Sequence, residues 1–72
     1  MKLEQGEYVA IPYEDLELPD NPNAYWKNGM SYDATVDSRG VMSLTSEGIG
    51  ITKYTSKAVE NMKSVFNFER IN

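Results

Sequence analysis

The stretch YDATVDSRGVMSLTSEGIGITKY (residues 32–54) decides the fold, because apolar and polar residues alternate along it between turn signals. Residues 32–36, 41–46 and 49–54 each place apolar side chains at every second position, which is typical of strands with one buried face. Residues 37–40 (Asp-Ser-Arg-Gly) and the pair Glu47-Gly48 separate these segments and are typical of tight turns. The stretch therefore predicts three consecutive antiparallel strands.

A fourth strand is predicted just before this stretch, at Ala24-Tyr25-Trp26-Lys27. It is followed by Asn28-Gly29, and Asn-Gly is a strong hairpin signal because a type I′ turn needs positive φ at both central positions. We therefore expect the strand at residues 24–27 to pair directly with the strand that begins near Met30. The four strands would form an antiparallel meander from about Ala24 to Tyr54.

The N-terminal third is less regular. Residues 7–13 alternate in a way that suits a strand, and Pro12, which has no backbone N–H, predicts that this strand lies at an edge or ends there. Residues 14–20 are compatible with a strand, one helical turn or a loop. Residues 19–23 contain two prolines among turn-forming residues and are predicted to be a loop.

The hydrophobic period changes after residue 54. Thr55 or Ser56 can cap a helix, and the residues that follow carry an apolar stripe at helical spacing. The stripe consists of Ala58, Val59, Met62, Val65 and Phe66. Phe68 is expected in the core, and Ile71 is assigned to neither core nor surface. The predicted fold is a single small α+β domain over residues 1–72, an antiparallel β-meander of about four or five strands with one C-terminal amphipathic helix packed on one face.

Composition argues against most enzymes. The chain contains no histidine and no cysteine, so it lacks the usual proton shuttle, the strongest neutral-pH nucleophile and the commonest zinc ligands. Glu14, Asp15 and Glu17 are close in sequence, but nothing in the pattern buries them, so a solvated face is favoured over an acid–base pair or a calcium site. Gly48-Ile49-Gly50 lacks the rest of a phosphate-binding loop. We expect no catalytic residues, no metal and no cofactor.

The charge is unevenly distributed. Residues 1–20 hold six acidic residues and one lysine, a formal charge of −5, whereas the rest of the chain sums to +1. Nucleic-acid-binding proteins usually show the opposite, a basic stripe. No apolar run approaches the roughly 20 residues that span a membrane, and the first residues contain no apolar signal region. We therefore expect a cytoplasmic protein that does not bind membranes.

The favoured interpretation is a non-enzymatic protein-binding module. Acidic side chains would steer a host or cognate protein with a basic surface, and aromatic side chains would anchor it. The predicted steering residues are Glu14, Asp15, Glu17 and Asp20, and the predicted anchors are Tyr13, Tyr25 and Trp26. Because the acidic segment can oppose a basic groove, the protein could be a modulator or inhibitor of a host nucleic-acid enzyme. Small size, acidity and the lack of catalytic side chains are also typical of many phage and mobile-element proteins.

Two other functions are compatible with the sequence. A thin-cored protomer with edge strands could self-assemble into a homo-oligomer. Alternatively, Tyr25, Trp26, Lys27 and Lys53 could hold single-stranded nucleic acid by stacking and charge, although the acidic balance opposes this. The sequence leaves Tyr25 and Trp26 open between core and interface.

Overall fold

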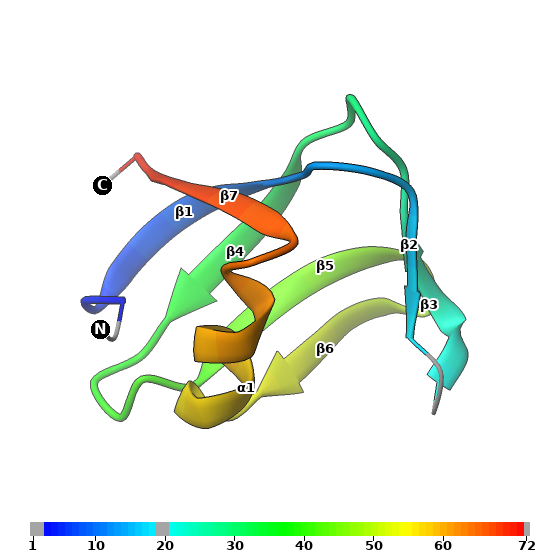
Figure 1. Ribbon diagram of the computed structural model, residues 1–72. Coiled ribbons are helices and arrows are strands. Elements are labelled where there is room, and N and C mark those ends of the chain that lie inside the picture. The colour runs from blue at the N-terminus through cyan, green and yellow to red at the C-terminus, as the bar shows by residue number, and fades with distance from the viewer. Residues whose placement is uncertain (1–2, 19–20, 72) are drawn as a thin grey trace.

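The computed structural model (Figure 1) describes residues 3–18 and 21–71, except for the side chains of residues 18 and 21–23. These residues form an antiparallel sheet with one helix, which confirms the predicted sheet-rich α+β class, but the strands number seven rather than four or five. The elements are β1 (Gly6–Pro12), β2 (Leu16–Leu18), β3 (Asn21–Trp26), β4 (Tyr32–Val36), β5 (Met42–Gly48), β6 (Gly50–Tyr54), α1 (Ser56–Met62) and β7 (Phe66–Arg70).

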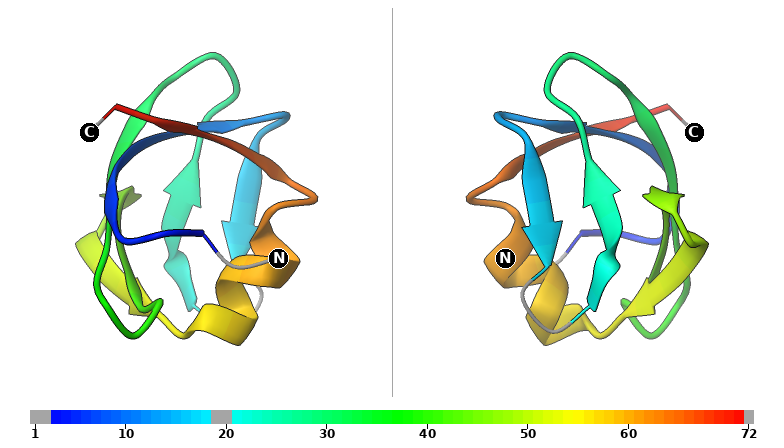
Figure 2. Two further views of the ribbon diagram at one scale, coloured as in Figure 1. Left: turned by 90° about the vertical axis from the view of Figure 1, so that its left-hand side faces the viewer. Right: turned by 90° about the vertical axis from the view of Figure 1, so that its right-hand side faces the viewer.

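Strand β5 organises the sheet, whose order is β2-β3-β5-β4-β1-β7 with β6 also paired to β5. Residues 42–46 of β5 pair with β6, residues 42–44 pair with β4, and residues 47–48 pair with β3. Figures 1 and 2 show that the strands curl around a common interior, with β1 beside β7 and with α1 at the lower end. One long strand therefore connects two parts of the sheet.

The predicted hairpins have different outcomes. The β4–β5 and β5–β6 hairpins are confirmed, the first with its turn at residues 37–41. The second hairpin turns at Ile49 rather than at the predicted Glu47-Gly48, which belongs to β5 because it pairs with β3. The predicted β3–β4 hairpin is wrong, because both strands pair with β5 instead of with each other. Gly29 has φ +87°, but no described non-glycine residue has positive φ, so Asn28 does not adopt the type I′ conformation. Met30 N–H still donates to the Lys27 carbonyl (3.2 Å), which closes a turn between two strands that do not pair.

The structure also shows which secondary structure the N-terminal segment adopts. Residues 16–18 form β2, a short strand paired with β3. The predicted loop at residues 19–23 is wrong for residues 21–23, which begin β3, and residues 19–20 lie outside the described chain. Strand β1 does end at Pro12, as its missing N–H predicts. The loop prediction failed because β2 pairs with this segment, Leu18 lying opposite Asn21, despite its poor strand propensity.

The helix is shorter than its apolar stripe predicts, and it is not C-terminal. Thr55 is the N-cap, with its Oγ1 accepting a hydrogen bond from the Ala58 N–H (3.2 Å), and α1 ends at Met62. Val65 lies in the following turn, and Phe66 begins β7, where it pairs with Pro12. Pairing with β1 therefore ends the helix, although the apolar residues continue at helical spacing.

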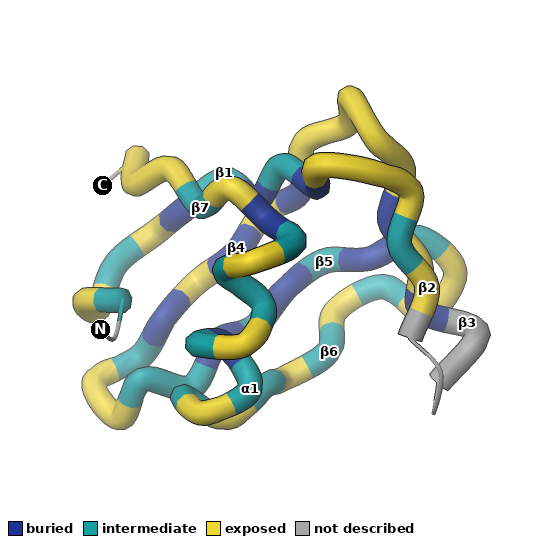
Figure 3. The backbone as a smooth tube through the Cα atoms, in the orientation of Figure 1, coloured by how far each residue is buried: buried dark blue, intermediate teal, exposed yellow. Residues whose placement is uncertain are grey.

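The core lies on the inner face of the curled sheet. Figure 3 shows buried residues alternating with less buried ones along β4 and β5. The buried apolar residues are Tyr8, Ala10, Ala24, Trp26, Tyr32, Ala34, Val36, Met42, Leu44, Val59 and Phe66. Phe68 packs partly buried against them, as expected, and Ile71 is exposed. Ile51 is 69% exposed, because the register that pairs Leu44 with Thr52 turns Ile51 outward.

Candidate functional site

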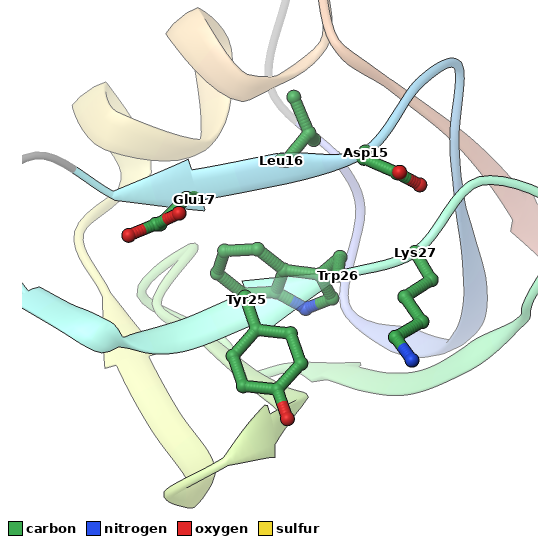
Figure 4. A pocket seen from close by; sticks show the side chains of 6 residues that line it. All are labelled: Asp15, Leu16, Glu17, Tyr25, Trp26 and Lys27. Atoms are coloured by element: carbon green, nitrogen blue, oxygen red, sulfur yellow. The ribbon is translucent and has the colours of Figure 1, made fainter.

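The β2–β3 hairpin carries an open cleft of about 210 Å³. We call it the Tyr25 cleft. It is lined by Asp15, Leu16, Glu17, Tyr25, Trp26 and Lys27 (Figure 4). Leu16 pairs with Trp26 and Glu17 pairs with Tyr25 across the two strands. Because side chains alternate between the faces of a strand, Leu16 and Trp26 turn toward the core, and Glu17 and Tyr25 turn toward solvent.

A row of three side chains crosses the outer face here. Glu17 of β2 lies opposite Tyr25 of β3, and Tyr25 in turn lies opposite Glu47 of β5. Residues directly opposite each other in antiparallel strands have Cβ atoms about 4.5–5.5 Å apart. The register therefore places the Tyr25 ring, which is 38% exposed, between two glutamate side chains.

A hydrogen-bonded network holds one of these glutamates. The Tyr32 hydroxyl donates to Glu47 Oε2 (2.9 Å) and accepts from the backbone N–H of Lys27 (2.8 Å). Burial is the largest cause that raises the pKa of Tyr32, and the Glu47 carboxylate adds to it, whereas the Lys27 N–H acts in the opposite direction. The phenol therefore stays protonated at neutral pH and continues to donate to Glu47.

Asp15 has a positioning role. Its Oδ1 accepts a hydrogen bond from the backbone N–H of Asn28 (2.8 Å). This bond ties the segment before β2 to the turn after β3, so the two sides of the cleft are joined at one end.

The structure brings together four of the seven predicted partner-binding residues: Asp15, Glu17, Tyr25 and Trp26. Tyr13 and Glu14 are exposed in the bend between β1 and β2 and do not line the cleft. Asp20 lies outside the described residues.

Trp26 is a core residue that forms the floor of the cleft. It is 1% exposed, its indole N–H donates to the Thr45 carbonyl (2.9 Å), and its ring meets Phe66 edge-on at 5.3 Å between centroids. It therefore supports the site from below, and Tyr25 is the accessible ring. Tyr8 and Tyr32 are also buried, so they add nothing to a stacking surface for single-stranded nucleic acid.

Glu47 is the site residue that sequence reasoning missed. The sequence pattern predicts only a turn there, with Gly48. Its place two residues after Thr45 on an alternating strand indicates that it faces outward, but its position beside Tyr25 depends on the β3–β5 pairing, which no local pattern predicts.

In the described part of the chain, no group of three or more acidic side chains could hold a metal ion. Among the same residues, no helix is long and apolar enough to cross a membrane. No family model matches the chain, and no curated protein or solved structure matches it either.

Proposed function

We propose that the protein is a non-enzymatic binding module that docks a basic surface of a partner protein through the outer face of β2 and β3. The observation that carries the proposal is the row Glu17–Tyr25–Glu47, an exposed aromatic ring between two carboxylates beside an open cleft. Tyrosine is enriched among the residues that contribute most to protein interfaces. The flanking carboxylates supply charge complementarity to a basic partner.

The charge around the cleft supports the same partner class. Asp15, Glu17 and Glu47 provide three carboxylates, against the single ammonium group of Lys27. Exposed Glu14 extends the negative surface toward the β1–β2 bend. Such a surface opposes the basic groove of a nucleic-acid enzyme, so the finer form of the proposal is a modulator or inhibitor of such an enzyme, of the kind that phages and mobile elements encode.

Affinity capture with matched variants tests the proposal. Wild-type protein, Tyr25→Ala, Glu17→Gln and the control Glu69→Gln are immobilised and exposed to host lysate with and without nuclease. Glu69 is an exposed glutamate on β7, which does not pair with β2, β3 or β5, so its substitution removes the same charge elsewhere.

The proposal predicts one host protein that is retained by wild type and by Glu69→Gln in both lysates, is released by moderate salt and is lost from Tyr25→Ala. Retention that is insensitive to salt and to both cleft substitutions would contradict the proposal. Recovery of nucleic acid alone, abolished by nuclease, would favour nucleic-acid binding instead.

A second candidate, self-assembly, rests on a different observation. Within the described chain, β6 pairs only with β5, and it carries Ile51, which is 69% exposed. Ile49, in the adjoining turn, is 43% exposed. An open edge with exposed apolar side chains can pair with a second copy. Sedimentation at micromolar concentration would then show a dimer that Ile51→Lys converts to monomer, and a monomeric wild type would contradict this candidate.

A further inference from the structure

We propose that the Tyr25 cleft binds the guanidinium group of an arginine side chain presented by a basic segment of the partner. This inference rests on the proposed function and specifies the chemistry of the same surface. The ring supplies a face on which a cation can lie, and the neighbouring carboxylates supply acceptors at its margins.

The two glutamates are suited to this task in different ways. Glu47 is preset, because Tyr32 already donates to its Oε2 and leaves Oε1 to accept from a ligand. The Glu17 carboxylate is exposed and forms no ion pair with any described residue. A cation between them would therefore meet one fixed and one adaptable acceptor without breaking an existing ion pair.

The planar shape of guanidinium favours arginine over lysine. Guanidinium stacks on an aromatic face while its N–H groups donate in the plane to carboxylates, whereas an ammonium is a compact and strongly hydrated charge. Buried Trp26 and half-buried Leu16 close the cleft on its inner side, so the bound group would lie against an apolar floor with its donors at the rim.

Lys27 is the one basic residue that lines the cleft. Figure 4 shows its side chain on the same side of β3 as the Tyr25 ring. Its ammonium repels an incoming cation. Neutralising Lys27 should therefore strengthen arginine binding. Long-range attraction between the peptide and the chain as a whole would not give Lys27 a larger effect than lysines far from the cleft.

Peptide titration followed by amide chemical shifts tests the inference. The probes are the blocked peptide GRGRG and its counterparts with lysine or with citrulline, the neutral isostere of arginine, in place of both arginines. The expected result is saturable shifts at residues 17, 25 and 47 and at the Trp26 indole N–H. The lysine peptide should bind roughly 2- to 5-fold more weakly, and the citrulline peptide should give no saturable shifts.

Variants locate the binding. Tyr25→Ala and Glu17→Gln should each weaken arginine-peptide binding by about 2- to 5-fold or more, Lys27→Gln should strengthen it, and Glu69→Gln should leave it within about 2-fold. Tyr25→Phe keeps the ring and should retain most of the binding that Tyr25→Ala loses, and the amide spectrum of each variant shows whether it is folded.

Equal binding of the three peptides, or equal binding by wild type, Tyr25→Phe and Tyr25→Ala, would overturn the guanidinium assignment. That assignment can fail while capture of a host protein still depends on Tyr25, in which case the proposed function stands. Host-protein capture that does not depend on Tyr25 would instead overturn the proposed function.

Discussion

Replacing Trp26 with phenylalanine tests whether this residue, which forms the floor of the Tyr25 cleft, also stabilises the core. Trp26 is 1% exposed, and its indole N–H donates to the Thr45 carbonyl on β5. The smaller ring removes that hydrogen bond and leaves part of the indole volume empty, while it can still face Phe66. The substitution therefore separates the core role of this residue from its aromatic character.

The expected cost follows from these contacts. A lost hydrogen bond costs about 1 kcal/mol, and the lost ring atoms cost about 1–2 kcal/mol at ~0.8 kcal/mol per buried CH₂ equivalent. The free energy of unfolding should fall by about 2–3 kcal/mol, out of roughly 4–11 kcal/mol expected for a chain of this length. The midpoint of thermal unfolding should fall by about 8–24 °C.

Urea and thermal unfolding followed by circular dichroism measure this change, with Tyr25→Phe as the matched control. Tyr25 is the preceding residue on β3 and faces solvent, so loss of its hydroxyl should change stability by less than about 0.5 kcal/mol. A Trp26→Phe variant within about 0.5 kcal/mol of wild type, or a control that is equally destabilised, would refute the assignment of Trp26 to the core.

Three further predictions concern the turns and the buried phenol. Gly40→Ala should lower the free energy of unfolding by at least about 1–2 kcal/mol in urea titrations, because φ is +83° and the new Cβ would meet Ser56 Cβ at 3.0 Å. The side-chain hydrogen bond from Arg39 is the largest cause that lowers the pKa of Asp37, so its stabilising contribution is present at neutral pH and is lost as the pH falls below about 4. Asp37→Asn should flatten that part of the stability–pH curve. Burial raises the pKa of Tyr32, so stability should fall as the pH rises through about 10, and Tyr32→Phe should show a shallower fall in the same titration.

Local sequence signals predicted the parts of the fold that depend on neighbouring residues. Residues 32–36 and 41–46 alternate cleanly and are joined by a turn in which Asp37 Oδ1 accepts from the backbone N–H groups of Arg39 and Val41, so the β4–β5 hairpin follows from the sequence. The Thr55 cap likewise marks the start of α1. In each case the interaction that decides the structure joins residues close in the chain.

Pairings between distant segments were not predictable in the same way. The Asn28-Gly29 signal was outweighed by pairing of β3 with the second half of β5. Phe66 lies in β7 rather than in the predicted helix, because β7 pairs with β1. The candidate site was predictable only in part. Charge and aromaticity identify Glu17 and Tyr25, whereas the position of Glu47 beside them depends on the strand order of the sheet.

Photo-crosslinking from position 25 tests most directly whether the partner docks on this face. A photoreactive phenylalanine analogue replaces Tyr25 in one variant and Glu69 in another, and both are irradiated in host lysate at low and at moderate salt. We predict one crosslinked host protein from position 25, suppressed by moderate salt, and none from position 69. Equal crosslinking from both positions, or none from position 25 while the host protein is still captured, would contradict the account.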